Sequence, residues 1–154
     1  MSVLTKFREG SIVVVGDIEK MFCQINVNQC HVIYQKFLWF KDNDVDGEIE
    51  ERFLTHFMFG AKPSPTVAIY AVRQTAKDHV NEFPPSFQDI VANNFYFDDA
   101  ATSTNTIEEA KTIATDLPKL LNKGGFHLTK LLSNHPEVNL AIPPAERAKS
   151  LRHF

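Results

Sequence analysis

The sequence has few of the residues that build disulfide-bonded or metal-bound domains. Its 154 residues include two cysteines, Cys23 and Cys30, and six histidines. The six residues that separate the two cysteines match no zinc-ligand spacing, and two thiols make no disulfide framework. The histidines are scattered without paired spacing. We therefore expect incidental thiols and no metal site built from cysteine or histidine.

Positive charge and long apolar runs are also scarce. Sixteen Lys and Arg residues stand against nineteen Asp and Glu, so the formal net charge is −3. The composition therefore shows no basic footprint of the kind that nucleic-acid-binding domains carry. The longest apolar runs, such as residues 12–15, fall far short of the roughly 18 residues that a membrane span needs. Residues 1–9 also lack the apolar stretch of a secretory signal, so we expect an intracellular, cytoplasmic protein with no membrane part.

The pattern of apolar and turn-forming residues predicts one α+β unit. With 44% hydrophobic residues and no repeat or Gly/Ser linker, the chain is expected to form a single core. Predicted strands are residues 12–15, 34–40, 52–59 and 126–132, with a tight hairpin over 95–103. Predicted helical segments are residues 18–24, 64–79, 87–93 and 106–123. This order indicates an antiparallel sheet covered by helices on one side.

Specific residues predict where some of these elements begin. Ser64 is expected to cap a helix whose first residue is Pro65, and Thr106 with Glu109 has the spacing of a capping box. Pro118 conflicts with this pattern, because a proline inside a helix costs about 3 kcal/mol.

Acidic residues at two strand ends are the strongest chemical signal. Asp17 follows Gly16 at the end of a β-branched strand, and Asp98 and Asp99 form the acidic tip of the aromatic hairpin. Adjacent strand residues point to opposite faces, so the pair can serve one site only where the backbone bends. An acidic pair at a turn is most often a solvated tip. On neighbouring strand ends, however, three carboxylates are the ligands that hard divalent cations prefer.

Five ordered blocks carry a resemblance to a known family. They are residues 16–22, 35–39, 59–65, 94–99 and 124–126, the last followed by Lys130. In this order they resemble the reverse transcriptase palm of BEL/Pao-type LTR retrotransposons, over nearly the whole chain. The resemblance implies a polymerase palm in residues 7–24 and 64–154, with residues 25–63 inserted as part of the fingers subdomain.

The resemblance also implies catalytic roles. It places two Mg²⁺ ions, with Mn²⁺ as a substitute, on Asp17, Asp98, Asp99 and the main-chain carbonyl of Ile18. The reaction would be in-line transfer of a deoxynucleotide to a primer 3′-hydroxyl. Lys130 resembles the lysine that protonates the pyrophosphate, with a solvated surface lysine as the alternative.

Further positions match parts of the family that bind the substrate. Phe22 resembles the aromatic residue that excludes a 2′-hydroxyl, with a core phenylalanine as the alternative. Phe59, Gly60, Ser64 and Pro65 resemble the segment beneath the incoming nucleotide and the template, although Phe59 stands where many retroviral relatives have Gln.

Partners follow from the same resemblance. They are an RNA or DNA template with its primer, deoxynucleoside triphosphates, and the rest of an element polyprotein: the remaining fingers, thumb, RNase H, protease and integrase, within a virus-like particle. The alternatives are an inactive remnant or co-opted interaction module that keeps the palm fold, and a nucleotide-binding protein of unrelated fold.

Overall fold

The computed structural model of the chain describes residues 3–149, so residues 150–154 of the expected palm lie outside the described residues. The strands are β1 (Ile12–Ile18), β2 (Lys36–Phe40), β3 (Ile49–Phe53), β4 (Phe95–Tyr96), β5 (Asp99–Thr104) and β6 (Leu128–Ser133). The α-helices are α1 (Val3–Lys6), α2 (Ser64–Asp78), α3 (Ser86–Asn93), α4 (Ile107–Lys123) and α5 (Pro136–Ala141). Three 3₁₀ helices are η1 (Met21–Gln24), η2 (Gln29–Gln35) and η3 (Lys41–Asn43).

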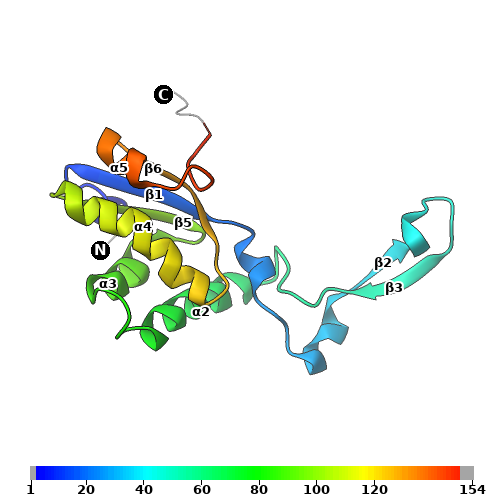
Figure 1. Cartoon of the computed structure of the whole chain (residues 1–154). Coiled ribbons are helices and arrows are strands. Elements are labelled where there is room, and N and C mark those ends of the chain that lie inside the picture. Colours follow the sequence, from blue (N-terminus) through cyan, green and yellow to red (C-terminus); the bar gives the residue numbers. More distant parts are fainter. Residues whose placement is uncertain (1–2, 150–154) are drawn as a thin grey trace.

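A four-stranded antiparallel sheet with the order β4-β5-β1-β6 forms the body of the molecule (Figure 1). Along β1, every second residue from Ile12 to Ile18 is buried, and the residues between them are half-buried. This alternation is that of a strand with one face on a core. The prediction that the strand ends at Gly16-Asp17 was wrong. Because β5 and β6 pair with β1 on both sides, it continues to Ile18.

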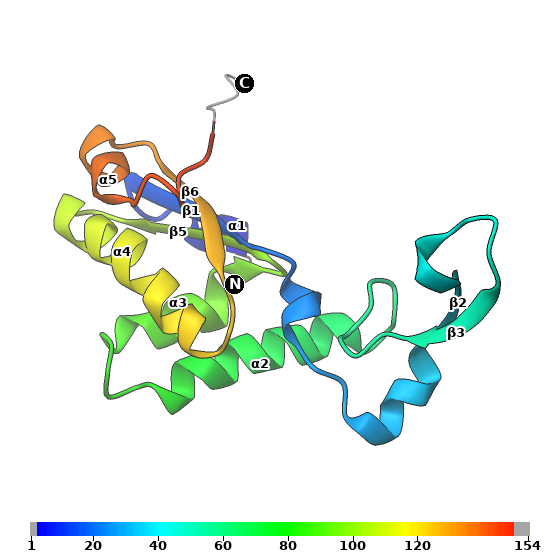
Figure 2. The same cartoon turned by 45° about the vertical axis from the view of Figure 1, so that its right-hand side comes forward.

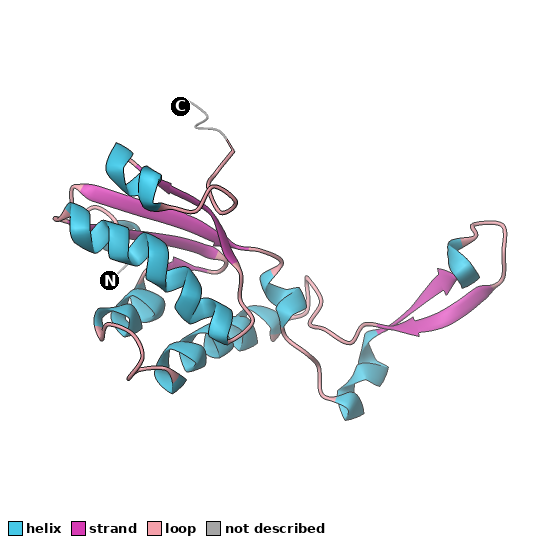
Figure 3. Ribbon diagram, in the orientation of Figure 1, coloured by secondary structure: helices cyan, strands magenta, loops and turns pink. Residues whose placement is uncertain are grey.

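Helices cover one face of this sheet, as Figure 3 shows by secondary structure. Helix α4 packs on β1, β5 and β6, while α2 packs on α3 and α4. The core between the two layers consists of small and branched apolar side chains, among them Val72, Ala110, Leu117, Leu121 and Leu128. The predicted fold class, α+β with an antiparallel sheet backed by helices, is confirmed. Within residues 3–149, no helix is long and apolar enough to cross a membrane.

Strands β2 and β3 form a separate two-stranded ribbon that projects from the body (Figure 2). The chain turns between them at residues 44–47, where the Gly47 amide donates to the Asp44 carbonyl. The strand predicted over 34–40 begins two residues later, at Lys36, and the strand predicted over 52–59 lies at 49–53 instead. Residues 29–35 form η2, in which the Asn28 side chain accepts a hydrogen bond from the Cys30 amide. The register pairs Lys36 with Phe53, so β3 ends there and residues 54–59 are irregular.

Helix α2 begins differently from the prediction. Ser64 is the first helical residue, not the cap, and its hydroxyl donates to the Met58 carbonyl at 2.9 Å. Its amide donates to the Ala61 carbonyl, and the residue is 1% exposed. Ser64 therefore closes the loop that precedes the helix, and Pro65 occupies the second helical position.

Thr106 caps helix α4 as predicted, but the return contact from the Glu109 side chain to the Thr106 amide does not form. The Thr106 side chain accepts from the Glu109 amide at 3.3 Å. The Glu109 carboxylate accepts from the Thr104 hydroxyl instead of the Thr106 amide. The hydroxyls of Thr104 and Thr106 together hold the pKa of Glu109 below its usual value. The helix then continues through Pro118 as one 17-residue element.

Replacing Pro118 measures how much stability an interior proline costs helix α4. We expect Pro118→Ala to raise the free energy of unfolding by up to about 3 kcal/mol, because alanine restores the amide donor that proline lacks. Urea denaturation followed by circular dichroism measures the change. The control is Lys119→Ala, which removes a surface ion pair with Asp116 and should change stability by less than about 1 kcal/mol. An unchanged or lower stability in Pro118→Ala would contradict the expectation.

Candidate active site

The end of β1 and the start of β5 bring two of the predicted carboxylates together. The antiparallel register places Asp17 directly opposite Asp99. The amide of Ile18 donates to the Asp98 carbonyl at 2.8 Å, so Asp17 and Asp99 form a non-hydrogen-bonded pair. In such pairs the Cα atoms are about 4.5 Å apart and the side chains share one face of the sheet. That face is the one that the helices leave open, since Gly16 and Ile18 point to the core.

The turn between β4 and β5 places the third carboxylate. Phe97 and Asp98 are the two residues between the strands, and Phe97 has a φ of 56°, in the left-handed region. This conformation is unfavourable for a residue with a side chain, and it produces the bend that the adjacent aspartates require. Asp98 is half-buried and Asp99 exposed. Ile18 itself is 1% exposed, so only its main chain faces this edge.

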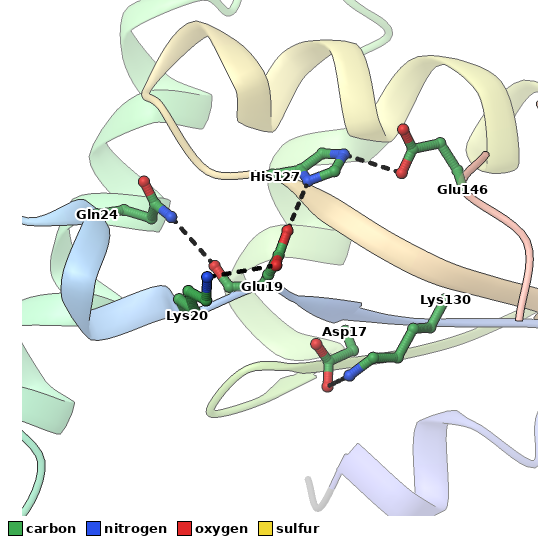
Figure 4. A network of polar contacts seen from close by, with 7 residues as sticks. All are labelled: Asp17, Glu19, Lys20, Gln24, His127, Lys130 and Glu146. Carbon is green, nitrogen blue, oxygen red and sulfur yellow. Dashed lines mark hydrogen bonds and ion pairs between the residues drawn. The ribbon is translucent and has the colours of Figure 1, made fainter.

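A β-bulge brings Lys130 to the same place. Between Val15 and Asp17 the register with β6 shifts, so that Lys130 and Leu131 both lie opposite Gly16. Lys130 has a φ of 52°, and Thr129 and Lys130 both point away from the core. A bulge re-aims a side chain in this way. The Lys130 ammonium consequently donates to Asp17 Oδ2 at 3.1 Å (Figure 4).

The carboxylates at this edge repel one another, and one ammonium partly neutralises them. Partial desolvation of the Asp99 carboxylate and then the negative charges of Asp98 and Asp17 raise the pKa of Asp99, while Lys130 partly offsets the rise. Three carboxylates against one ammonium leave an excess of negative charge on a partly dry edge. Such an edge favours a bound cation or a proton.

The donor chemistry of this edge fits a hard divalent cation, which prefers carboxylate and carbonyl oxygens. The side chains are not gathered into a ligand set, however. Among residues 3–149, no three His, Cys, Asp or Glu side chains lie close enough together to hold a metal ion. Lys130 occupies Asp17 Oδ2, so a cation at Asp17 and Asp99 would have to displace its ammonium.

The predicted substrate-binding residues form a second group. Phe22 in η1 and Phe59 in the loop before α2 pack edge to face, with ring centroids 5.0 Å apart. Phe22 is half-buried against the core, whereas Phe59 is 67% exposed. Gly60 has a φ of 84°, and a Cβ there would contact nothing within 4 Å, so the backbone conformation alone requires glycine. Within the described residues, no hydrogen bond or ring contact joins this group to the carboxylates.

Sequence reasoning missed a charged bridge beside the carboxylates. His127 Nδ1 lies 3.2 Å from Glu19, and its Nε2 lies 2.9 Å from Glu146 (Figure 4). These two carboxylates, Glu146 first, raise the pKa of His127. The bridge ties the chain after β1 to the segment that follows α5. No local sequence motif predicts the contact among Glu19, His127 and Glu146, because the three residues are far apart in the sequence.

The raised pKa of Asp99 predicts a stability that falls as this residue ionises. Protonated Asp99 carries no penalty, so the wild type is relatively most stable below pH 3.8, the ordinary pKa of the group. We expect Asp99→Asn to be more stable than the wild type at about pH 7 and equal to it at about pH 3. Urea denaturation at the two pH values measures this. The same difference at both would show that the charge of Asp99 has no part in it.

The His127 bridge predicts the opposite pH dependence. A histidine with a raised folded pKa contributes stability below its ordinary value of 6.5 and loses it as the pH rises through the folded pKa. We expect His127→Gln to be less stable than the wild type at about pH 5.5 and nearly equal to it at about pH 9. Thermal unfolding at both pH values checks this. A deficit that persists at high pH would assign His127 a packing role instead.

Comparisons with known proteins find a likeness among solved structures. No protein-family model and no curated protein matches the chain. A foamy viral protease-reverse transcriptase, solved in complex with an RNA/DNA hybrid, matches the structure with a TM-score of 0.62 and 20% sequence identity. The match covers 82% of this chain and 15% of that protein. The chain thus has a reverse-transcriptase-like fold and spans a small part of the length of this neighbour.

Proposed function

We propose that the chain is the catalytic palm of an RNA-directed DNA polymerase from a BEL/Pao-type LTR retrotransposon. The observation that carries this proposal is the register that sets Asp17 opposite Asp99, with Asp98 in the adjoining turn. The reverse-transcriptase-like fold supports it. The five sequence blocks support the retrotransposon type.

The carboxylates in this proposal hold positive charge beside a primer end. Asp17 and Asp99 face the open side of the sheet, and Asp98 adds a third carboxylate at the turn. Mg²⁺ bound there would lower the pKa of the primer 3′-hydroxyl and neutralise the leaving pyrophosphate. Because the reaction is in-line phosphoryl transfer, the main task of the protein is to position the reacting groups.

Lys130 has two consecutive tasks in this mechanism. Before substrate binds, its ammonium neutralises Asp17 and limits the repulsion among the carboxylates. If a divalent cation bound to the Asp17 carboxylate, the Lys130 ammonium would be free to turn toward the substrate. The pyrophosphate leaves with an additional negative charge, which a proton from Lys130 would neutralise.

The aromatic group selects and supports the nucleotide. Phe22 lies five residues after Asp17, in the 3₁₀ helix η1 that follows the end of β1. A ring beside the sugar excludes a 2′-hydroxyl by steric overlap, which favours deoxynucleotides. Phe59 holds the Phe22 ring edge to face, and Gly60 lets the chain turn beneath the nucleotide and template. Ser64 contributes by closing that loop, since its own side chain is buried.

The ion pair between Lys130 and Asp17 also favours a second candidate, a palm fold without catalysis. In a non-catalytic remnant or interaction module, Lys130 would neutralise Asp17 permanently. Exposed apolar side chains on and beside the β2–β3 ribbon, such as Tyr34, Leu38 and Ile49, would then serve protein contacts. The two candidates differ in whether a divalent cation displaces Lys130.

Primer extension tests the catalytic proposal. The polypeptide in which this chain is joined to the remaining fingers and thumb should extend a DNA primer on an RNA template only when Mg²⁺ or Mn²⁺ is present. We expect Asp17→Asn and Asp98→Asn each to lower the extension rate by at least about 100-fold, because each removes a cation ligand. The matched control is Asp116→Asn, an aspartate on α4 paired with Lys119, which should retain the rate.

Unchanged extension in Asp98→Asn would refute the proposal. Paramagnetic broadening by Mn²⁺ on the 154-residue chain separates the two candidates directly. Broadening confined to the amides of residues 16–18, 97–100 and 129–131, and lost in Asp17→Asn, supports the polymerase. Broadening spread over all surface carboxylates supports the remnant.

A further inference from the structure

A cavity with apolar and charged lining residues lies at the opposite end of β5 from the carboxylates. Its volume is about 490 Å³, within the usual range for small-ligand sites. Residues of α3, α4 and the outer edge of β5 line it, and Lys6 and Glu9 contribute from the N-terminal segment. Strand β4 pairs only with Asp99 and Ala100 of β5. Within residues 3–149, no strand pairs with residues 102–104 on the side of β5 that faces away from β1, and these residues border the cavity.

The charges that line this cavity are mostly negative. Four carboxylates face one ammonium: Glu9, Asp89, Glu108 and Glu109 against Lys6. Lys6 pairs with Asp89 at 3.0 Å, and Glu108 pairs with Lys111 outside the cavity. Between residues 3 and 149, neither Glu9 nor Glu109 has a cationic partner. The cavity thus carries an excess of unneutralised carboxylate.

Two buried neutral side chains add acceptors that the protein does not use. Thr102 is 4% exposed and lines the cavity from the helix-covered face of β5, and its hydroxyl forms no hydrogen bond within residues 3–149. Asn94 is 6% exposed, and its amide nitrogen donates to the Ala101 carbonyl at 3.3 Å. The Asn94 side-chain oxygen receives no hydrogen bond from the described residues. Neither oxygen is among the side-chain atoms sealed from solvent, so both can accept a hydrogen bond from a molecule bound in the cavity.

We propose that this cavity binds an alkyl guanidinium cation, either a free small molecule or an arginine side chain of a protein. A guanidinium group presents five N–H donors in one plane, which suits a mixture of carboxylate, hydroxyl and amide oxygens. An alkyl stem would lie against the apolar part of the lining, where Phe87, Ile90 and Ile113 are found. The carboxylates would repel an anion, and a purely apolar ligand would leave Thr102, Asn94 and the carboxylates unmatched.

The cavity is separate from the proposed catalytic edge. Asp99 and Thr104 are the two ends of β5, and five residues of a strand span about 17 Å. Binding there does not depend on polymerase activity, and its test is independent of the proposed function.

Titration of the ¹⁵N-labelled chain with agmatine, an alkyl guanidinium, tests the proposal. We expect saturable shifts confined to the amides of residues 9–10, 102–104 and 107–109. Thr102→Val should weaken binding at least about fivefold, because one hydrogen bond to the ligand is lost. The same variant should fold with unchanged or greater stability, since the hydroxyl has no partner in the protein. Glu9→Gln should also weaken binding, and Glu48→Gln on the distant ribbon should not.

Two results would overturn the proposal. One is a set of shifts that rise linearly and that potassium chloride reproduces at equal ionic strength. The other is unchanged agmatine binding in Thr102→Val. Comparison with a capped Gly-Arg-Gly peptide distinguishes the sources: tighter binding of the peptide points to a protein arginine, and tighter binding of agmatine points to a free small molecule.

Discussion

Gly16 sits at a crowded point of the sheet, where β1 passes between β5 and β6. A Cβ on this residue would lie 2.9 Å from Leu131 Cδ2 and 3.3 Å from Leu128 Cδ1. The absence of a side chain lets these two leucines close over the strand and join the core. The same point is where β6 accommodates its additional residue, because Lys130 and Leu131 together oppose Gly16. Close packing on the core side and the bulge therefore occur at one residue of β1.

The candidate active site depends on this arrangement. With Gly16 facing the core, Asp17 must face the open side, and the register then sets it opposite Asp99. The bulge turns Lys130 to the same side, where its ammonium reaches Asp17. A slip of one residue in either pairing would move a carboxylate or the ammonium to the other face. Partial desolvation of Asp99, followed by repulsion among the carboxylates, is the cost of this geometry, and both appear as the raised pKa of Asp99.

Local sequence signals predicted the elements with strong patterns and missed those set by distant contacts. The β-branched strand β1, the Thr106 cap of α4 and the hairpin around Asp98 were all visible in the sequence, whereas the alternating burial along β1 was not. The helix start near Ser64 was also visible, but the role of Ser64 was not, because its hydroxyl donates to the Met58 carbonyl instead of capping the helix. The bulge at Lys130 and the His127 bridge depend on partners far along the chain. In the candidate site, acidic residues at strand ends indicated the carboxylates, and the family resemblance alone indicated the two phenylalanines. The edge-to-face contact of those rings and the ion pair on Asp17 required the fold.

The pairing of Asp17 with Asp99 is the central claim, and a nuclear Overhauser experiment between α-protons measures it directly. In a non-hydrogen-bonded antiparallel pair the two α-carbons approach to about 4.5 Å, and their α-protons point toward each other. The structure predicts a strong cross-peak between the α-protons of Asp17 and Asp99. A cross-peak from Asp17 to Ala100 or to Asp98 instead would mean that the register is shifted by one residue. That result would separate the carboxylates onto opposite faces and contradict the proposed active site.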